Sequence, residues 1–159
     1  MSHSSSTIQS WGRAPQFWSY LRVLGCHLQL PPDASKSSSS NYWPFWLIPT
    51  ALPISRVRVV GRLVSIFSSI KFTKLQLDDG SGALVGVIVF HNDNNTTLPE
   101  WQLGQLYVVQ GRLEWFRGRV QVSAMSCQKK TDIWVELMHW MEVIDQMEGQ
   151  KIHGAPHWQ

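Results

Sequence analysis

The fold is decided by residues 56–66, which read Arg-Val-Arg-Val-Val-Gly-Arg-Leu-Val-Ser-Ile. Arginine and valine alternate at the start of this stretch, and that period is typical of a half-buried strand. Gly61 then interrupts the pattern, and a glycine within a long strand indicates a bulge or a tight bend. The stretch therefore predicts a long, bent strand that begins near Ser55.

Four more segments downstream have strand patterns. They are Phe72–Asp79, Ala83–Phe90, Gln105–Trp115 and Arg119–Met125. Asp78-Asp79-Gly80-Ser81-Gly82 and Phe116-Arg117-Gly118 have the chemistry of turns, because aspartate caps its own backbone and glycine tolerates a positive φ. Five antiparallel strands with a bent first strand predict an all-β fold, a five-stranded Greek-key barrel of the OB-fold type. A small up-and-down β-sandwich is the alternative.

Helices are expected on both sides of the barrel. Residues Trp11–Leu30 place Phe17, Leu21, Leu24 and Leu28 at helical spacing, and Thr131 or Asp132 caps a last helix that ends near Met147. Tyr42–Pro53 is too rich in proline for a helix or a central strand. The predicted organisation is an N-terminal extension with a short helix and a Ser-rich linker (1–41), the barrel (42–130), the helix (131–147) and a flexible tail (148–159).

Composition excludes a fully disordered chain, because 43% of the 159 residues are hydrophobic, 16% are charged and nine are tryptophan. The net charge of +3 permits an anionic partner. We expect no signal peptide and no membrane contact, since the first ten residues have no apolar run and no stretch reaches about 20 apolar residues. Cys26 and Cys127 fit no metal-ligand spacing and are expected to be ordinary buried thiols in a reducing compartment.

Catalytic patterns are missing from the sequence. Asp78 and Asp79 are adjacent, which suits the capping of a turn better than two-carboxylate catalysis. His153 and His157 are close in sequence but lie in the predicted tail, which makes a weak metal signal. The sequence has no Ser-His-Asp signature and no phosphate-binding glycine loop. We therefore expect a protein without enzymatic activity, cofactor or metal.

Aromatic and cationic residues alternate on the predicted strands, a pattern typical of single-stranded nucleic-acid binding, in which rings stack on bases and cations follow the backbone. The candidate residues are Lys74, Phe90, Trp115, Phe116, Arg117 and Arg119. Packing of these rings in the core or the hairpin is the alternative. The modest net charge predicts weak, salt-dependent binding by this chain alone.

The last predicted helix is more apolar than one packing face requires. An arc of about 140° holds most of its large apolar side chains, whereas packing on a barrel needs a stripe of about 100°. The residues in the arc are Ile133, Trp134, Leu137, Trp140, Met141, Ile144 and Met147. The excess predicts an interface with a partner, and coverage by the Trp-rich N-terminal segment is the alternative.

The strand, turn and helix segments described above together resemble one known protein family. Leu52–Val64, the turn Leu77–Gly82 and the helix Asp132–Met141 resemble the Stn subunit of the CST telomere-capping complex, in its short plant-like form. The resemblance extends over residues 11–147. The strand opening and the Asp-Asp-Gly turn are also similar to the middle subunit of replication protein A, which is the alternative for function.

The resemblance implies a nuclear, non-catalytic subunit at the telomeric end of the chromosome. Its partners would be a small OB-fold Ten subunit, bound by the C-terminal helix, the large CST subunit, single-stranded G-rich telomeric DNA and polymerase α–primase. Phe90 and Phe116 match positions for DNA, while Glu114 stands where the family often has a basic residue. Together with the helix pattern, the implied partner-binding residues are Asp78, Trp134, Leu137, Met138, Met141 and Ile144.

Overall fold

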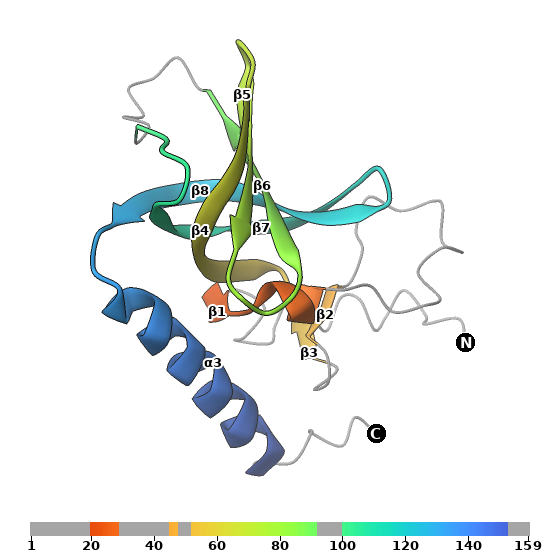
Figure 1. Ribbon diagram of the computed structural model, residues 1–159. Coiled ribbons are helices and arrows are strands. Elements are labelled where there is room, and N and C mark those ends of the chain that lie inside the picture. Colours follow the sequence, from red (N-terminus) through yellow and green to blue (C-terminus); the bar gives the residue numbers. More distant parts are fainter. Residues whose placement is uncertain (1–19, 29–44, 48–51, 92–99, 153–159) are drawn as a thin grey trace, which may run out of the picture.

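The computed structural model describes residues 20–28, 45–47, 52–91 and 100–152. It confirms the five predicted strands, which are β4 (Arg56–Ser68), β5 (Phe72–Asp78), β6 (Leu84–Phe90), β7 (Leu106–Phe116) and β8 (Arg119–Lys130). These strands pair in the order β4-β5-β6-β8-β7, and β4 also pairs with β7, so they form a ring (Figure 1). The last strand is longer than predicted and continues past Met125.

β4 closes the ring because it changes partner along its length. Its first part pairs antiparallel with β7, its second part pairs with β5, and Arg62 pairs with both. The register shifts between Leu63 and Ser65, just beyond the glycine at which a bend was predicted. A Cβ on Gly61 would lie 3.0 Å from the carbonyl oxygen of Asp78. The glycine therefore permits the close approach of β5 where β4 changes partner.

The ring is closed unevenly. β7 and β8 are paired along their length, whereas β6 and β8 run parallel and are paired only from Gly86 to Ile88. Inward-facing residues of all five strands fill the interior, as strand alternation requires. The buried core consists of Val23, Val57, Val59, Leu63, Leu75, Leu77, Val85, Val87, Val89, Tyr107, Val109, Leu113 and Val122.

The predicted N-terminal helix is wrong over residues 20–28. Tyr20–Arg22 forms strand β1, which pairs parallel with β4, and Gly25–Leu28 forms the 3-10 helix η1. Between them, Val23 and Leu24 are buried. The rest of the predicted helix, residues 11–19 and 29–30, lies outside the described residues.

An unpaired strand edge explains this difference. β5 pairs with β4 only from Arg62 onward, so the first part of β4 would present a free row of backbone groups on that side. β1 occupies this edge and pairs with Arg56, Val57 and Arg58. The leucines at helical spacing could not reveal an edge that only the folded barrel creates.

Phe45–Leu47 and Leu52–Ile54 form two short antiparallel strands, β2 and β3, in a sheet of their own. The described residues of 42–53 thus form no helix and no strand of the barrel sheet, as predicted. The serine-rich linker lies outside the described residues.

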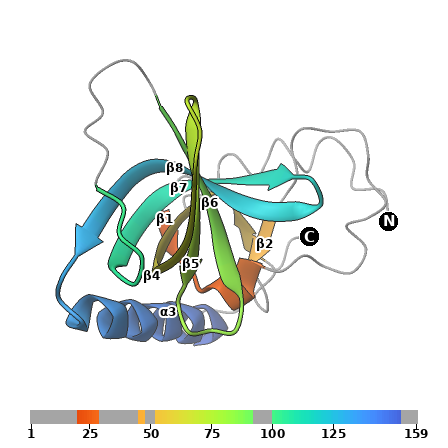
Figure 2. The ribbon, with the colours of Figure 1, turned by 45° about the horizontal axis from the view of Figure 1, so that its top comes forward.

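The last helix, α3 (Trp134–Ile152), extends past Met147, where its end was predicted. A carboxylate oxygen of Asp132 accepts a hydrogen bond of 2.9 Å from the backbone N–H of Trp134, which caps the helix as expected. α3 lies across one end of the barrel, on the side of β1 and β4 (Figures 1 and 2).

Gly111 supplies a test of the barrel geometry. A Cβ at this position would lie 2.2 Å from the carbonyl oxygen of Ser123, so a side chain would force the backbones of β7 and β8 apart. We expect Gly111→Ala to lower the free energy of unfolding by about 1–3 kcal/mol in urea denaturation. Gly86→Ala is the matched control, because its Cβ would meet only the Cβ of Gln121, at 3.9 Å. Equal losses of unfolding free energy in the two variants would contradict the close approach of Gly111 to the backbone of Ser123.

Candidate nucleic-acid interface and partner-binding helix

An aromatic ladder lies on the outward faces of β4, β5 and β6. Phe72 is the cross-strand partner of Phe90, and their ring centroids are 6.5 Å apart in an edge-to-face arrangement. On the other side, the Phe72 ring lies 6.4 Å from the ring of Phe67. Phe67 and Phe90 are both more than half exposed, at 61% and 51%. Exposed rings in a row are the stacking platform that single-stranded nucleic acid requires.

The β7–β8 hairpin brings a further ring and cations to this ladder. Arg117 and Gly118 both have positive φ, 48° and 77°, as a two-residue type I′ turn demands. The turn places the Arg117 guanidinium 5.1 Å from the centroid of the Phe116 ring. The Lys74 ammonium lies 5.0 Å from the same centroid and 5.5 Å from that of Phe72. Lys74 therefore joins the hairpin to the aromatic ladder.

We call this set the aromatic surface, and it consists of Phe67, Phe72, Lys74, Phe90, Phe116 and Arg117. Arg119 is exposed and is the register partner of Phe116, which places it at the margin of the surface. Trp115 does not join it, because successive residues of a strand point to opposite faces. Strand alternation thus separates Trp115 from the other candidates predicted on the sequence.

Sequence reasoning missed Phe67 and Phe72. A usable signal was present, because Phe72 is two residues from Lys74 and therefore on the same face of a predicted strand. Phe67 could be placed only with the register of the β4–β5 pair, in which it lies opposite Lys74. That register depends on the irregularity between Leu63 and Ser65, and Gly61 indicates a bulge nearby without fixing the residue at which the register shifts.

Asp78 and Asp79 act in a turn, as predicted. Asp78 Oδ1 accepts the N–H of Gly80 at 2.9 Å, and Asp79 Oδ1 accepts the N–H of Ser81 at 2.9 Å. Asp79 is buried, and its other oxygen accepts the N–H of Gly25 at 2.5 Å. The turn therefore also anchors the segment after β1, and it leaves Asp78 exposed.

The inner face of α3 holds the helix on the barrel through polar contacts and through the apolar side chains of Val135, Val143 and Met147. His139 Nε2 donates to the carbonyl oxygen of Val23 at 3.0 Å, and Trp140 Nε1 donates to that of Asp79 at 2.9 Å. Gln146 binds both the N–H and the carbonyl of Arg22. Three ion pairs add to these contacts, namely Arg22–Glu142, Arg58–Glu142 and Arg62–Glu136. The exposed residues of the apolar arc therefore make none of these docking contacts.

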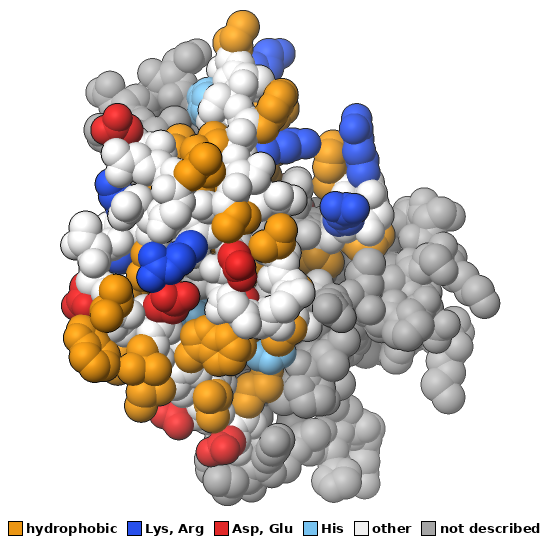
Figure 3. Space-filling view, in the orientation of Figure 1, with side chains coloured by type: hydrophobic (Ala, Val, Ile, Leu, Met, Phe, Trp, Pro, Cys, Tyr) orange, Lys and Arg blue, Asp and Glu red, His pale blue; other side chains and the backbone are white. Residues whose placement is uncertain are grey.

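The outer face of α3 is apolar and exposed, between 48% and 67% for each residue (Figure 3). It consists of Trp134, Leu137, Met138, Met141 and Ile144, with Ile133 just before the helix, and we call this set the outer helix face. Met138, which lay off the densest predicted arc, is as exposed as Met141. Of the arc, Trp140 and Met147 turn toward the barrel. Contiguous exposed apolar surface of this kind marks a site of protein association.

We expect His139 to make the docking of α3 sensitive to pH. Burial lowers the pKa of His139, as does the nearby Arg58, and these effects outweigh the hydrogen bond to Val23 and the carboxylates of Asp79 and Glu142, which raise it. Because the pKa of His139 is lower in the folded protein than in the unfolded chain, the unfolded chain takes up the proton at a higher pH. The contribution of His139 to the free energy of unfolding is therefore full above the ordinary pKa of 6.5 and decreases as the pH drops below it.

We expect the urea midpoint of the protein to fall between pH 7.5 and pH 5.5, and to fall less in His139→Gln, which does not titrate. The residual fall in the variant includes His27, whose pKa burial also lowers, against the carboxylate of Asp79. Identical pH dependence in the two proteins would show that His139 is not the titrating group.

The remaining candidates for chemistry are the two cysteines and the histidines near the C-terminal end. Cys26 and Cys127 are free thiols, as predicted, but both are only partly buried, and this burial raises the pKa of the Cys127 thiol to about 11. Among the described residues, His, Cys, Asp and Glu form no group of three that could hold a metal. His153 and His157 lie outside this part of the chain. Within the described segments, no helix is both long and apolar enough to cross a membrane.

Comparison with known proteins agrees with the five-stranded barrel described above. Residues 57–129 match the model of the OB-fold nucleic acid binding domain family. The CST complex subunit STN1 of Arabidopsis thaliana is 26% identical over 110 residues, which cover 57% of this chain and 69% of that protein. A 32 kDa subunit of replication protein A from Oryza sativa subsp. japonica is 32% identical over 97 residues. That alignment covers 58% of this chain but only 32% of the rice protein.

Among solved structures, the fold matches the S. pombe Stn1-ten1 complex with a TM-score of 0.56 and 21% identity. The match covers 66% of this chain and 82% of the other. The chain is thus an OB-fold protein that resembles the Stn subunits of CST complexes, as its sequence predicted.

Proposed function

We propose that this chain is a non-catalytic subunit of a CST-like complex, in the nucleus at the telomere. Its outer helix face binds a small OB-fold Ten subunit, and its aromatic surface contacts single-stranded G-rich telomeric DNA together with partner subunits. Such a complex contains a large CST subunit and supports C-strand fill-in by polymerase α–primase.

The observation that carries this proposal is the orientation of α3. Its barrel contacts come from the inner face, through Glu142, Gln146 and His139, so Trp134 and Met141 are left at the surface. A helix that presents five large apolar side chains to water on a folded barrel suits helix-to-helix association. The turn carrying Asp78 lies against the same helix through the Trp140–Asp79 hydrogen bond, which supports Asp78 as a margin of the interface.

The aromatic surface supports the DNA part of the proposal. Its cations are few and the net charge of the chain is +3, so we expect the isolated protein to bind single strands weakly and with marked salt dependence. Glu114, near the hairpin, stands where a basic residue would add a positive charge, and its carboxylate accepts a hydrogen bond from Gln121 at 3.5 Å. Strong binding therefore requires partner subunits.

A second candidate function is that of a replication protein A middle subunit, and the similarity to the rice protein favours it. Capture of the full tagged chain from nuclear extract, followed by identification of its partners, separates the two. Ten and large CST subunits among the partners support our proposal. Recovery of the large and small subunits of replication protein A in their place would support the alternative.

A further inference from the structure

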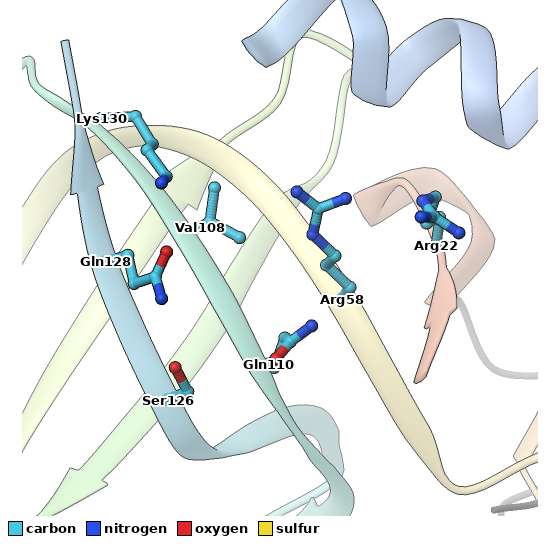
Figure 4. Close-up of a pocket in the computed structure, with 7 residues that line it drawn as sticks. All are labelled: Arg22, Arg58, Val108, Gln110, Ser126, Gln128 and Lys130. Atoms are coloured by element: carbon cyan, nitrogen blue, oxygen red, sulfur yellow. The ribbon is translucent and has the colours of Figure 1, made fainter. Parts of the chain in front are cut away.

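A basic pocket lies on a part of the barrel that the aromatic surface does not use. Side chains from β1, β4, β7 and β8 line a space of about 370 Å³ (Figure 4). Its cations are Arg22, Arg58 and Lys130, and its neutral polar groups are Gln110, Ser126 and Gln128. We call these six residues the basic pocket.

The positive charge of the basic pocket is only partly compensated. Glu142 of α3 pairs with both Arg22 and Arg58, at 2.5 and 3.4 Å from the nearest nitrogen of each. No carboxylate among the described residues pairs with Lys130. Two of the three cations therefore share one carboxylate and the third has none, and the amide and hydroxyl groups beside them are suited to an anion with several acceptor oxygens.

The lining favours a phosphodiester over a base or an apolar side chain. No aromatic ring lines the basic pocket, so it offers no stacking platform. Arginine, lysine, serine and glutamine side chains are the groups that contact phosphate and sugar in nucleic-acid complexes. An acidic peptide would meet the same charges, but protein interfaces also need buried apolar anchors, and Val108 is the only apolar side chain in the lining.

β7 connects the basic pocket to the aromatic surface. Alternate residues of this strand share one outward face, which carries Phe116, Glu114, Arg112, Gln110 and Val108 in turn. Phe116 and Gln110 are six residue steps apart along the strand, or about 20 Å. Arg112 is exposed on this path, and its register partner in β4 is Arg56.

We propose that the basic pocket binds the phosphate backbone of a single strand that continues from the aromatic surface along β7. That the ligand is single-stranded DNA rests on the proposed function. The positive charge of the pocket is observed in the structure and does not depend on it. It predicts that short and long strands respond differently to the same substitution, since only a long strand reaches Lys130.

The test compares two labelled oligothymidylates, of about 6 and about 20 nucleotides, by fluorescence anisotropy with the full chain at several salt concentrations. We expect Gln128→Glu, which adds a negative charge at nearly constant shape, to weaken binding of the long strand about three- to tenfold and to leave the short strand unchanged. Lys130→Ala should reduce the salt slope for the long strand by about 0.7, the value for one phosphate contact on a single strand.

Lys129→Ala is the matched control. Lys129 precedes Lys130 in β8, points to the other face and donates to Gln102, so its loss should leave the salt slope for both strands within error. Unchanged binding of the long strand by Gln128→Glu and Lys130→Ala overturns the proposal, as does absence of long-strand binding by the wild-type chain at low salt. Tighter capture of polyglutamate than of the long strand, lost in Lys130→Ala, would assign the pocket to an acidic peptide instead. None of these failures would affect association with a Ten subunit through α3, so they are distinguishable from failure of the proposed function.

Discussion

Replacement of Trp134 and Met141 by glutamate together is expected to abolish association with the Ten subunit. Both side chains lie on the outer helix face, at 63% and 50% exposure, and neither contributes a hydrogen bond between its side chain and the barrel. Central aromatic and apolar anchors of an interface each contribute about 2 kcal/mol or more, so loss of two weakens the complex about 1,000-fold. Co-purification of a tagged chain with its co-expressed partner measures the loss.

The β4–β5 hairpin supplies the matched control for this variant. Phe67 and Ile70 are also exposed apolar residues, at 61% and 95%, but their hairpin projects from the opposite end of the barrel from α3 (Figure 1). Phe67→Glu with Ile70→Glu introduces the same two charges and should leave co-purification intact. Retention of the partner by the α3 variant, or its loss in both variants, would contradict docking through the outer helix face.

The second large effect is expected on DNA. Phe90→Ala with Phe116→Ala removes two exposed rings that flank Lys74 and Phe72 on the aromatic surface. Since each stacked base contributes about 1–3 kcal/mol, the double variant should bind a single-stranded G-rich oligonucleotide about 30-fold or more weakly. Fluorescence anisotropy at low salt, on the chain bound to its Ten partner, gives the two dissociation constants.

Trp115→Ala is the control for the DNA variant, because it deletes an aromatic ring of the same hairpin that faces away from the aromatic surface. It should bind as the wild-type chain does. If Trp115→Ala weakened binding as much as the double variant, the strand would lie on the other face of the hairpin and the assignment of the aromatic surface would be wrong.

Strand patterns in the sequence predicted the barrel because they are local. Alternation around Val57 and Val59, the Asp79 turn and the Gly118 hairpin each depend on neighbouring residues only. The N-terminal helix was wrong for a non-local reason, since β1 forms where β4 leaves an edge uncovered by β5. Leu21 and Leu24 keep their apolar spacing and pack into the barrel from a different backbone.

The candidate sites were also predictable only where they depend on local sequence. The excess of apolar residues on α3 was visible in the sequence, but its direction was not, because polar residues such as His139 and Gln146 face the barrel. Phe72 and Lys74 share a face that alternation alone predicts. The basic pocket needs four strands in register, and its Arg22 comes from a segment expected to be helical.

Sedimentation velocity of the purified chain mixed with the purified Ten subunit of its own organism tests the central claim most directly. Completion of the outer helix face by a partner predicts one species with the mass of a 1:1 complex at micromolar concentration. Two independent species at that concentration would contradict it, because the apolar face of α3 would then be unrelated to a Ten subunit.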